Sequence, residues 1–116
     1  MTVTLHGIKN CDSVKKAREW LETAKIDYVF RDFREQPLSV PEAIGWLKSC
    51  GPEVVVNRRS TTWKQMDSSD RALADEPASA AALLVANPTL VKRPVLDNAG
   101  TFTIGFNADE YARIFN

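Results

Sequence analysis

The chain has 116 residues, 44% of them hydrophobic and 26% charged, which is ordinary for one globular domain. Its 15 basic and 15 acidic side chains cancel, so no overall field favours binding to nucleic acid or to an anionic membrane. The longest apolar run, Ala80 to Ala86, is too short to span a bilayer, and no charged-then-apolar leader opens the sequence. We therefore expect a single cytoplasmic domain over residues 1–116, without a nucleic-acid, membrane or metal partner.

The first residues predict a strand that ends at Gly7, followed by a helix with an apolar inward face. That face comprises Val14, Ala17, Leu21 and Ala24. Polar residues that favour helix N-termini surround Cys11, so this cysteine should sit at or just before the first turn. Free backbone N–H groups and the positive end of the helix dipole favour a thiolate there, which would make Cys11 a nucleophile.

The next elements extend this beginning into an α/β unit. An alternating pattern over Ile26–Phe33 predicts a second strand, parallel to the first through a right-handed crossover. A capping box at Ser39 predicts a second helix that closes at Cys50-Gly51-Pro52. Cys50 then lies at a helix C-terminus, where the dipole disfavours a thiolate, so we interpret it as structural. Both cysteines are expected to be free thiols.

The second half of the chain predicts a helix-containing insertion and a hairpin. Residues 53–75 are the least regular and contain a basic, hydroxyl-rich stretch with Arg58 and Arg59, which fits an anion site or a solvated surface. A helix is predicted over Pro77–Ala86, then strands over 91–97 and 101–104 in an antiparallel hairpin, and a last helix capped by Asn107. The predicted order is βαβα, a helical insertion, then ββα.

This order, with a cysteine at the first helix N-terminus and a proline at the third strand, resembles a thioredoxin fold. The implied fold class is α/β with a mixed sheet and a helical insertion between the second helix and the third strand. Three blocks carry a closer resemblance, namely residues 7–17, 58–63 and 92–95. Together they are similar to the arsenate reductase (ArsC)/Spx-like family, and within it to the YffB-type branch.

The resemblance implies roles for individual residues. Cys11 matches the nucleophilic cysteine of the family, and Arg93 matches the arginine that helps bind the oxyanion or stabilise the thiolate. Pro94 matches the proline that is cis in thioredoxin folds and faces the reactive sulfur. Cys11 and Arg93 are therefore the expected catalytic residues.

The arginine of the middle block has more than one match, because Arg58 and Arg59 are adjacent and Asn57 can also align with it. The expected substrate-binding residues are Asn10, Arg58, Arg59 and Pro94.

Two departures from the family pattern narrow the expected chemistry. Arsenate reductases of this type carry another arginine in the hairpin, whereas residues 100–106 contain no basic side chain, which argues against binding a multiply charged oxyanion. Spx regulators use a Cys-x-x-Cys pair, whereas the fourth position here is Val14, so an oxidised Cys11 needs an external thiol. Glutathione or another small thiol is the expected co-substrate, with glutaredoxin as a further redox partner and no bound cofactor.

The favoured interpretation is a glutathione-dependent monothiol reductase that uses Cys11 through a mixed disulfide. One alternative is a non-enzymatic, Spx-like transcriptional regulator or adaptor that binds a protein partner. The other alternative is a residual arsenate reductase.

Overall fold

The computed structural model describes residues 2–116, and the chain divides into two compact units. Unit 1 combines residues 2–33 with Arg93–Asn116, and unit 2 is the intervening segment Arg34–Lys92. No helix in residues 2–116 has both the length and the hydropathy that crossing a membrane requires. The expectation of a single domain over residues 1–116 stays a prediction.

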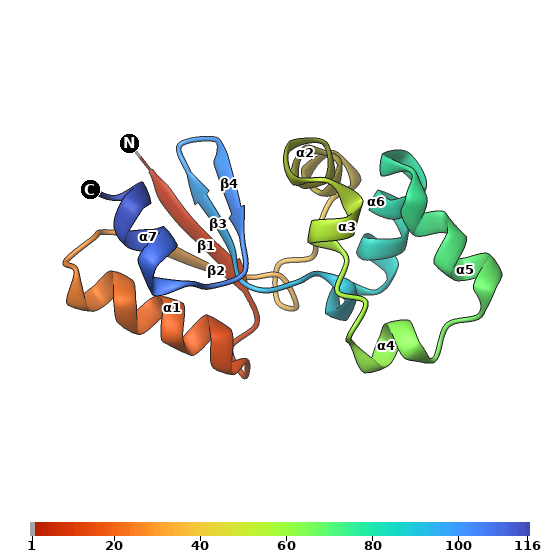
Figure 1. The fold of residues 1–116 in the computed structure, drawn as a ribbon, viewed down its shortest axis with the longest axis horizontal. Helices are drawn as coiled ribbons and strands as arrows, with labels where there is room; N and C mark the ends of the chain where they lie inside the picture. Colours follow the sequence, from red (N-terminus) through yellow and green to blue (C-terminus); the bar gives the residue numbers. More distant parts are fainter. Residues whose placement is uncertain (1) are drawn as a thin grey trace. The chain divides into compact units, whose positions relative to one another are not determined.

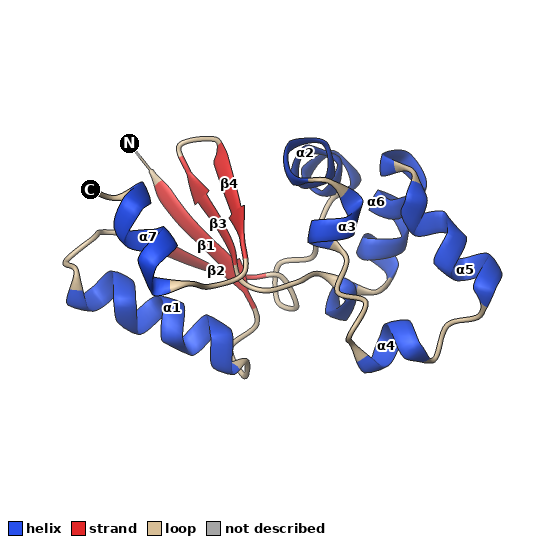
Figure 2. Cartoon of the chain, viewed as in Figure 1, coloured by secondary structure: helices blue, strands red, loops and turns tan. Residues whose placement is uncertain are grey.

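Unit 1 is built on a four-stranded mixed sheet with the order β2-β1-β3-β4 (Figure 1). Its strands, red in Figure 2, are β1 (Val3–Gly7), β2 (Val29–Asp32), β3 (Val95–Asn98) and β4 (Thr101–Ile104). β1 and β2 are parallel, as the sequence predicted, while β3 pairs antiparallel with both β1 and β4. The hairpin turn uses left-handed backbone at Ala99 and Gly100, with φ of 53° and 94°.

Helices α1 (Asp12–Thr23) and α7 (Ala108–Ile114) pack against one face of this sheet (Figure 1). The buried residues that join them to the sheet are Val3, Leu5, Ala17, Leu21, Leu96 and Tyr111. The Tyr111 ring makes edge-to-face contacts with Trp20 and Phe106, at centroid distances of 5.6 and 4.9 Å. Its hydroxyl is buried without a hydrogen-bond partner among residues 2–116. This burial, and secondarily the charge of Glu110, raises the pKa of the Tyr111 phenol.

The end of α1 differs from the sequence prediction. Lys25 adopts left-handed backbone with φ of 60°, and the N–H groups of Lys25 and Ile26 donate back to Glu22 and Leu21. This is the Schellman closure, usually made with glycine. Because the closure uses residues 24–26, Ala24 is exposed rather than inward-facing, and β2 begins only at Val29 instead of Ile26.

Unit 2 is helical and is organised by two longer helices that pack together, α2 (Val40–Cys50) and α6 (Pro77–Ala86). The shorter elements are α3 (Pro52–Val55), α4 (Thr61–Lys64), α5 (Ser68–Ala72) and the 3-10 turns η1 (Leu73–Asp75) and η2 (Pro88–Leu90). The predicted cap is confirmed, since Ser39 accepts a hydrogen bond from the N–H of Glu42. Residues 53–75, predicted to be irregular, instead form short helices, and Pro52 opens one of them.

The predicted strand over residues 91–97 also starts later in the structure. Val91 forms an isolated antiparallel bridge with Val56 in unit 2, and β3 begins at Val95. The Arg93–Pro94 peptide between them is cis, as the resemblance implied. Asn107 caps α7 by accepting from the N–H of Glu110. The predicted order of elements, βαβα, helical insertion and ββα, is confirmed.

Candidate functional site

Cys11 is the N-cap residue of α1. Its backbone is extended, with φ of −125° and ψ of 126°, and its carbonyl accepts the N–H of Lys15 at 3.0 Å. The thiol is half-buried and makes no capping hydrogen bond to the first turn. The first-turn N–H groups of α1 are therefore available to an anion at the sulfur or to an anionic group of a bound molecule.

Close packing between β1 and α1 sets where Cys11 lies. A Cβ built at Gly7 would stand 2.7 Å from Cγ2 of Val14, a side chain that is fully buried. Only glycine at the end of β1 therefore lets the first turn of α1 approach the sheet this closely. The first turn carries Cys11, so this contact fixes the cysteine near the carboxyl end of β1.

Arg93 and Pro94 lie at the same edge of unit 1 as the cysteine loop. β1 and β3 are antiparallel with His6 opposite Val95, so the residues just before Val95 lie where β1 ends. Arg93 is half-buried, and its Nε atom is enclosed by protein. Asn10 is exposed in the turn that leads to Cys11. The structure thus brings four of the six predicted site residues to one edge of this sheet.

Two buried polar side chains, His6 and Asp32, lie at the carboxyl ends of β1 and β2. Nη1 of Arg31 donates to Nδ1 of His6 at 3.1 Å, because a guanidinium has no acceptor, and this assigns the imidazole proton to Nε2. Oδ2 of Asp32 accepts the backbone N–H of Lys9 at 3.2 Å. The sequence analysis missed both contacts, which join residues more than 20 positions apart.

Arg58 and Arg59 belong to unit 2, and each is exposed there. The Arg58 guanidinium lies over the Trp63 ring, 5.1 Å from its centroid, which holds this side chain in a defined orientation. Arg71 also lies over this ring, at 5.6 Å, and donates to the carbonyls of Trp63 and Lys64. The sequence analysis missed Arg71, since no local motif links it to the tryptophan.

Cys50 is the last residue of α2 in unit 2 and is half-buried. Burial raises the pKa of the Cys50 thiol, which makes it a weaker nucleophile at neutral pH. This agrees with its interpretation as a structural residue. Both cysteines are free thiols, as predicted.

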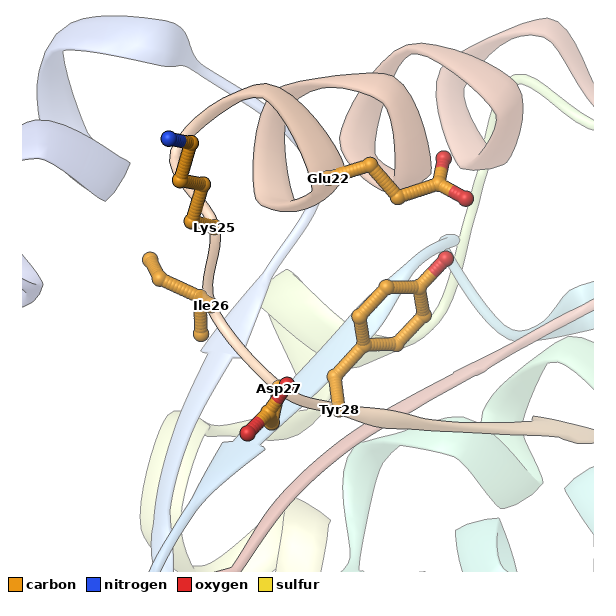
Figure 3. A pocket seen from close by; sticks show the side chains of 5 residues that line it. All are labelled: Glu22, Lys25, Ile26, Asp27 and Tyr28. Atoms are coloured by element: carbon orange, nitrogen blue, oxygen red, sulfur yellow. The ribbon is translucent and has the colours of Figure 1, made fainter.

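A surface hollow of about 330 Å³ lies in unit 1, far from the cysteine. Its lining residues are Glu22, Lys25, Ile26, Asp27 and Tyr28 (Figure 3). They surround the C-terminal end of α1, whereas Cys11 lies at its N-terminus, about 18 Å away for a helix of 12 residues. The hollow therefore takes no part in the candidate site.

Four features together define a thioredoxin-like α/β protein. They are a sheet of order β2-β1-β3-β4, helices on one face, a cysteine at the first helix N-terminus and a cis-proline before β3. The model of the ArsC family matches residues 6–114, and the chain belongs to this family.

Three known proteins are similar to this chain over nearly its whole length. A solved structure named YFFB protein has a TM-score of 0.91 at 38% identity, with 97% of each chain covered. An arsenate reductase (ArsC) related protein from Brucella melitensis is 40% identical, with a TM-score of 0.77 and coverage of 100% of this chain and 96% of that one. The global transcriptional regulator Spx of Listeria innocua is 31% identical over 113 residues, which is 96% of this chain and 85% of Spx. The predicted resemblance to the ArsC/Spx-like family and its YffB-type branch is confirmed.

Proposed function

We propose that the chain is a cytoplasmic, glutathione-dependent monothiol reductase whose nucleophile is Cys11. The observation that carries this proposal is a half-buried thiol at the N-cap of α1 with the first-turn N–H groups left open to an anion. The position one turn further on, where a second redox cysteine would stand, is the fully buried Val14. Oxidised Cys11 must therefore be resolved by a thiol from outside that turn.

The reaction proceeds by two thiol–disulfide exchanges. The Cys11 thiolate attacks the glutathione sulfur of a mixed disulfide between glutathione and a substrate thiol. A disulfide forms between Cys11 and glutathione, and the substrate leaves as a thiolate that takes a proton from water. A second glutathione thiolate then attacks the glutathione sulfur on Cys11, which releases the Cys11 thiolate and oxidised glutathione. The substrate gains the two electrons that the pair of glutathione molecules loses.

Arginine side chains supply the positive charge that would bind the carboxylates of glutathione. Arg93 lies at the edge that carries Cys11, where its guanidinium supports the thiolate and a glutathione carboxylate by paired hydrogen bonds. Arg58, oriented over Trp63, and the exposed Arg59 are kept as substrate-binding candidates on the family resemblance alone. Asn10 and Pro94 complete the proposed binding residues.

Intact-mass measurement after incubation with oxidised glutathione tests the proposal. We expect one glutathione adduct on the wild type and on Cys50→Ser, and none on Cys11→Ser. Arg93→Ala should form the adduct about tenfold more slowly, because a charge-assisted hydrogen bond is lost. Arg113→Ala, which removes an exposed arginine from α7, is the matched control and should react like the wild type. An adduct on Cys50, or none at all, would contradict the proposal.

A non-enzymatic role as a transcriptional regulator or adaptor is the second candidate, favoured by the similarity to Spx over nearly the whole chain. In that role a protein partner, such as RNA polymerase, binds the chain without turnover. Equal binding of RNA polymerase by wild type and Cys11→Ser, together with no reduction of a glutathionylated peptide, would favour this role over the reductase.

A further inference from the structure

We infer that Asp32 is a positioning residue for Cys11, which deepens the proposed function and rests on it. Asp32 is the last residue of β2 and only 7% exposed. A buried carboxylate is costly unless hydrogen bonds satisfy it. One such bond goes to the backbone N–H of Lys9, 23 positions earlier in the chain and two residues before the cysteine.

The hydrogen bond between Lys9 and Asp32 helps to hold the segment that leads to Cys11. Just after β2, the N–H of Phe33 donates to the carbonyl of Gly7 at 3.1 Å. The loop that leads to Cys11 is therefore held by the end of β2 at two points, Gly7 and Lys9. Only Asn10 separates the second point from Cys11, which is itself fixed as the N-cap of α1.

The geometry of disulfide exchange explains what this support does. The attacking sulfur must meet a disulfide with its three sulfur atoms nearly in line, and small displacements of a reacting group cost large factors in rate. A loop anchored at Lys9 presents the thiol in one direction relative to the sheet edge that carries Arg93.

Two substitutions separate the hydrogen bond from the charge of Asp32. Asp32→Asn keeps an oxygen acceptor for Lys9 and removes the charge, whereas Asp32→Ala removes both. We expect Asp32→Ala to lower the rate of Cys11 adduct formation with oxidised glutathione by about tenfold or more. The same variant should react with iodoacetamide, a small reagent without orientation demands, within about threefold of the wild type. Asp32→Asn should restore the glutathione rate to at least the wild-type value.

The matched control is Asp97→Ala. Asp97 also accepts a backbone N–H, that of Gly100 at 2.8 Å, but it does so at the hairpin turn, at the end of β3 away from Cys11. Its loss should leave both rates unchanged. The inference is overturned if Asp32→Ala keeps the wild-type glutathione rate, or if Asp32→Asn falls as far as Asp32→Ala.

Hydrogen exchange of the wild type tests the same contact without glutathione and without a variant. The Lys9 amide should exchange at least tenfold more slowly than the amide of Asn10, which has no partner among residues 2–116. Equal exchange of the two amides overturns the inference even if no variant folds. Protection of Lys9 in a protein that forms no glutathione adduct would instead refute the proposed function and leave the anchoring role of Asp32 supported.

Discussion

Gly7→Ala is the most informative single change in unit 1, because it adds one methyl group where β1 meets α1. The new Cβ would stand 2.7 Å from Cγ2 of Val14, about 0.7 Å short of the separation at which ordinary contact begins. Val14 is β-branched and fully buried, so it has little rotamer freedom with which to move aside. The first turn of α1 must therefore shift, and Cys11 shifts with it.

The expected loss is about 1–3 kcal/mol in the free energy of unfolding, the usual range for an overpacked core. Urea denaturation measures it. Gly45→Ala is the control, since a Cβ at Gly45 in α2 meets nothing within 4 Å. There the substitution should stabilise the protein by about 0.5–1 kcal/mol, because alanine is the better helix former.

A double-mutant cycle with Val14→Ala tests the mechanism. Val14→Ala alone leaves a cavity and should cost about 2 kcal/mol. In the double variant the methyl of the new alanine occupies part of that space, so the combined loss should be smaller than the two single losses together by at least about 1 kcal/mol. Losses that add within about 0.5 kcal/mol would refute the argument that Gly7 and Val14 compete for one space.

Three further outcomes follow from the described contacts. Tyr111→Phe removes a buried hydroxyl that has no partner and should raise the free energy of unfolding by about 1 kcal/mol in urea denaturation. The folded state raises the Tyr111 pKa, so ionisation of Tyr111 should cost no stability below about pH 10 and about 1.4 kcal/mol per pH unit above it, a contribution that the phenylalanine variant lacks. Cys50 should be alkylated more slowly than Cys11 at pH 7, as mass mapping of the labelled peptides would show, because burial raises its pKa. Arsenate should support no turnover with glutathione and glutaredoxin in a coupled assay, since residues 100–106 contain no basic side chain; robust turnover would restore the arsenate reductase alternative.

The features predicted from the sequence are those that neighbouring residues determine. The caps at Ser39 and Asn107 each use a side chain that accepts from a backbone N–H three positions further on, and the polar residues around Cys11 predicted where α1 begins. The cis-proline followed from a resemblance that spans the whole chain. Such features need no knowledge of which distant segments meet.

The features that the sequence analysis missed depend on distant contacts or on atypical residues. The left-handed position after α1 is Lys25 where glycine is usual, so the early end of the helix and the late start of β2 have no compositional signal. The Asp32–Lys9 hydrogen bond links the end of β2 to the turn after β1, and these adjoin only once β1 and β2 pair. Arg71 contacts Trp63 because α5 follows α4 closely. The irregular sequence of this region gave no pattern from which the contact could be predicted.

Val14 ties the packing of this chain to its redox chemistry. It fills the space beside Gly7, and it occupies the position one turn from Cys11 that a resolving cysteine would need. A thiol there would be fully enclosed, so an internal disulfide in this turn would require the β1–α1 contact to open. Under either proposed role, we therefore expect oxidised Cys11 to form an adduct with an outside thiol. For the reductase the adduct must be released by a second glutathione, whereas for a regulator it must persist, and the lifetime of the Cys11 adduct in reduced glutathione decides between them.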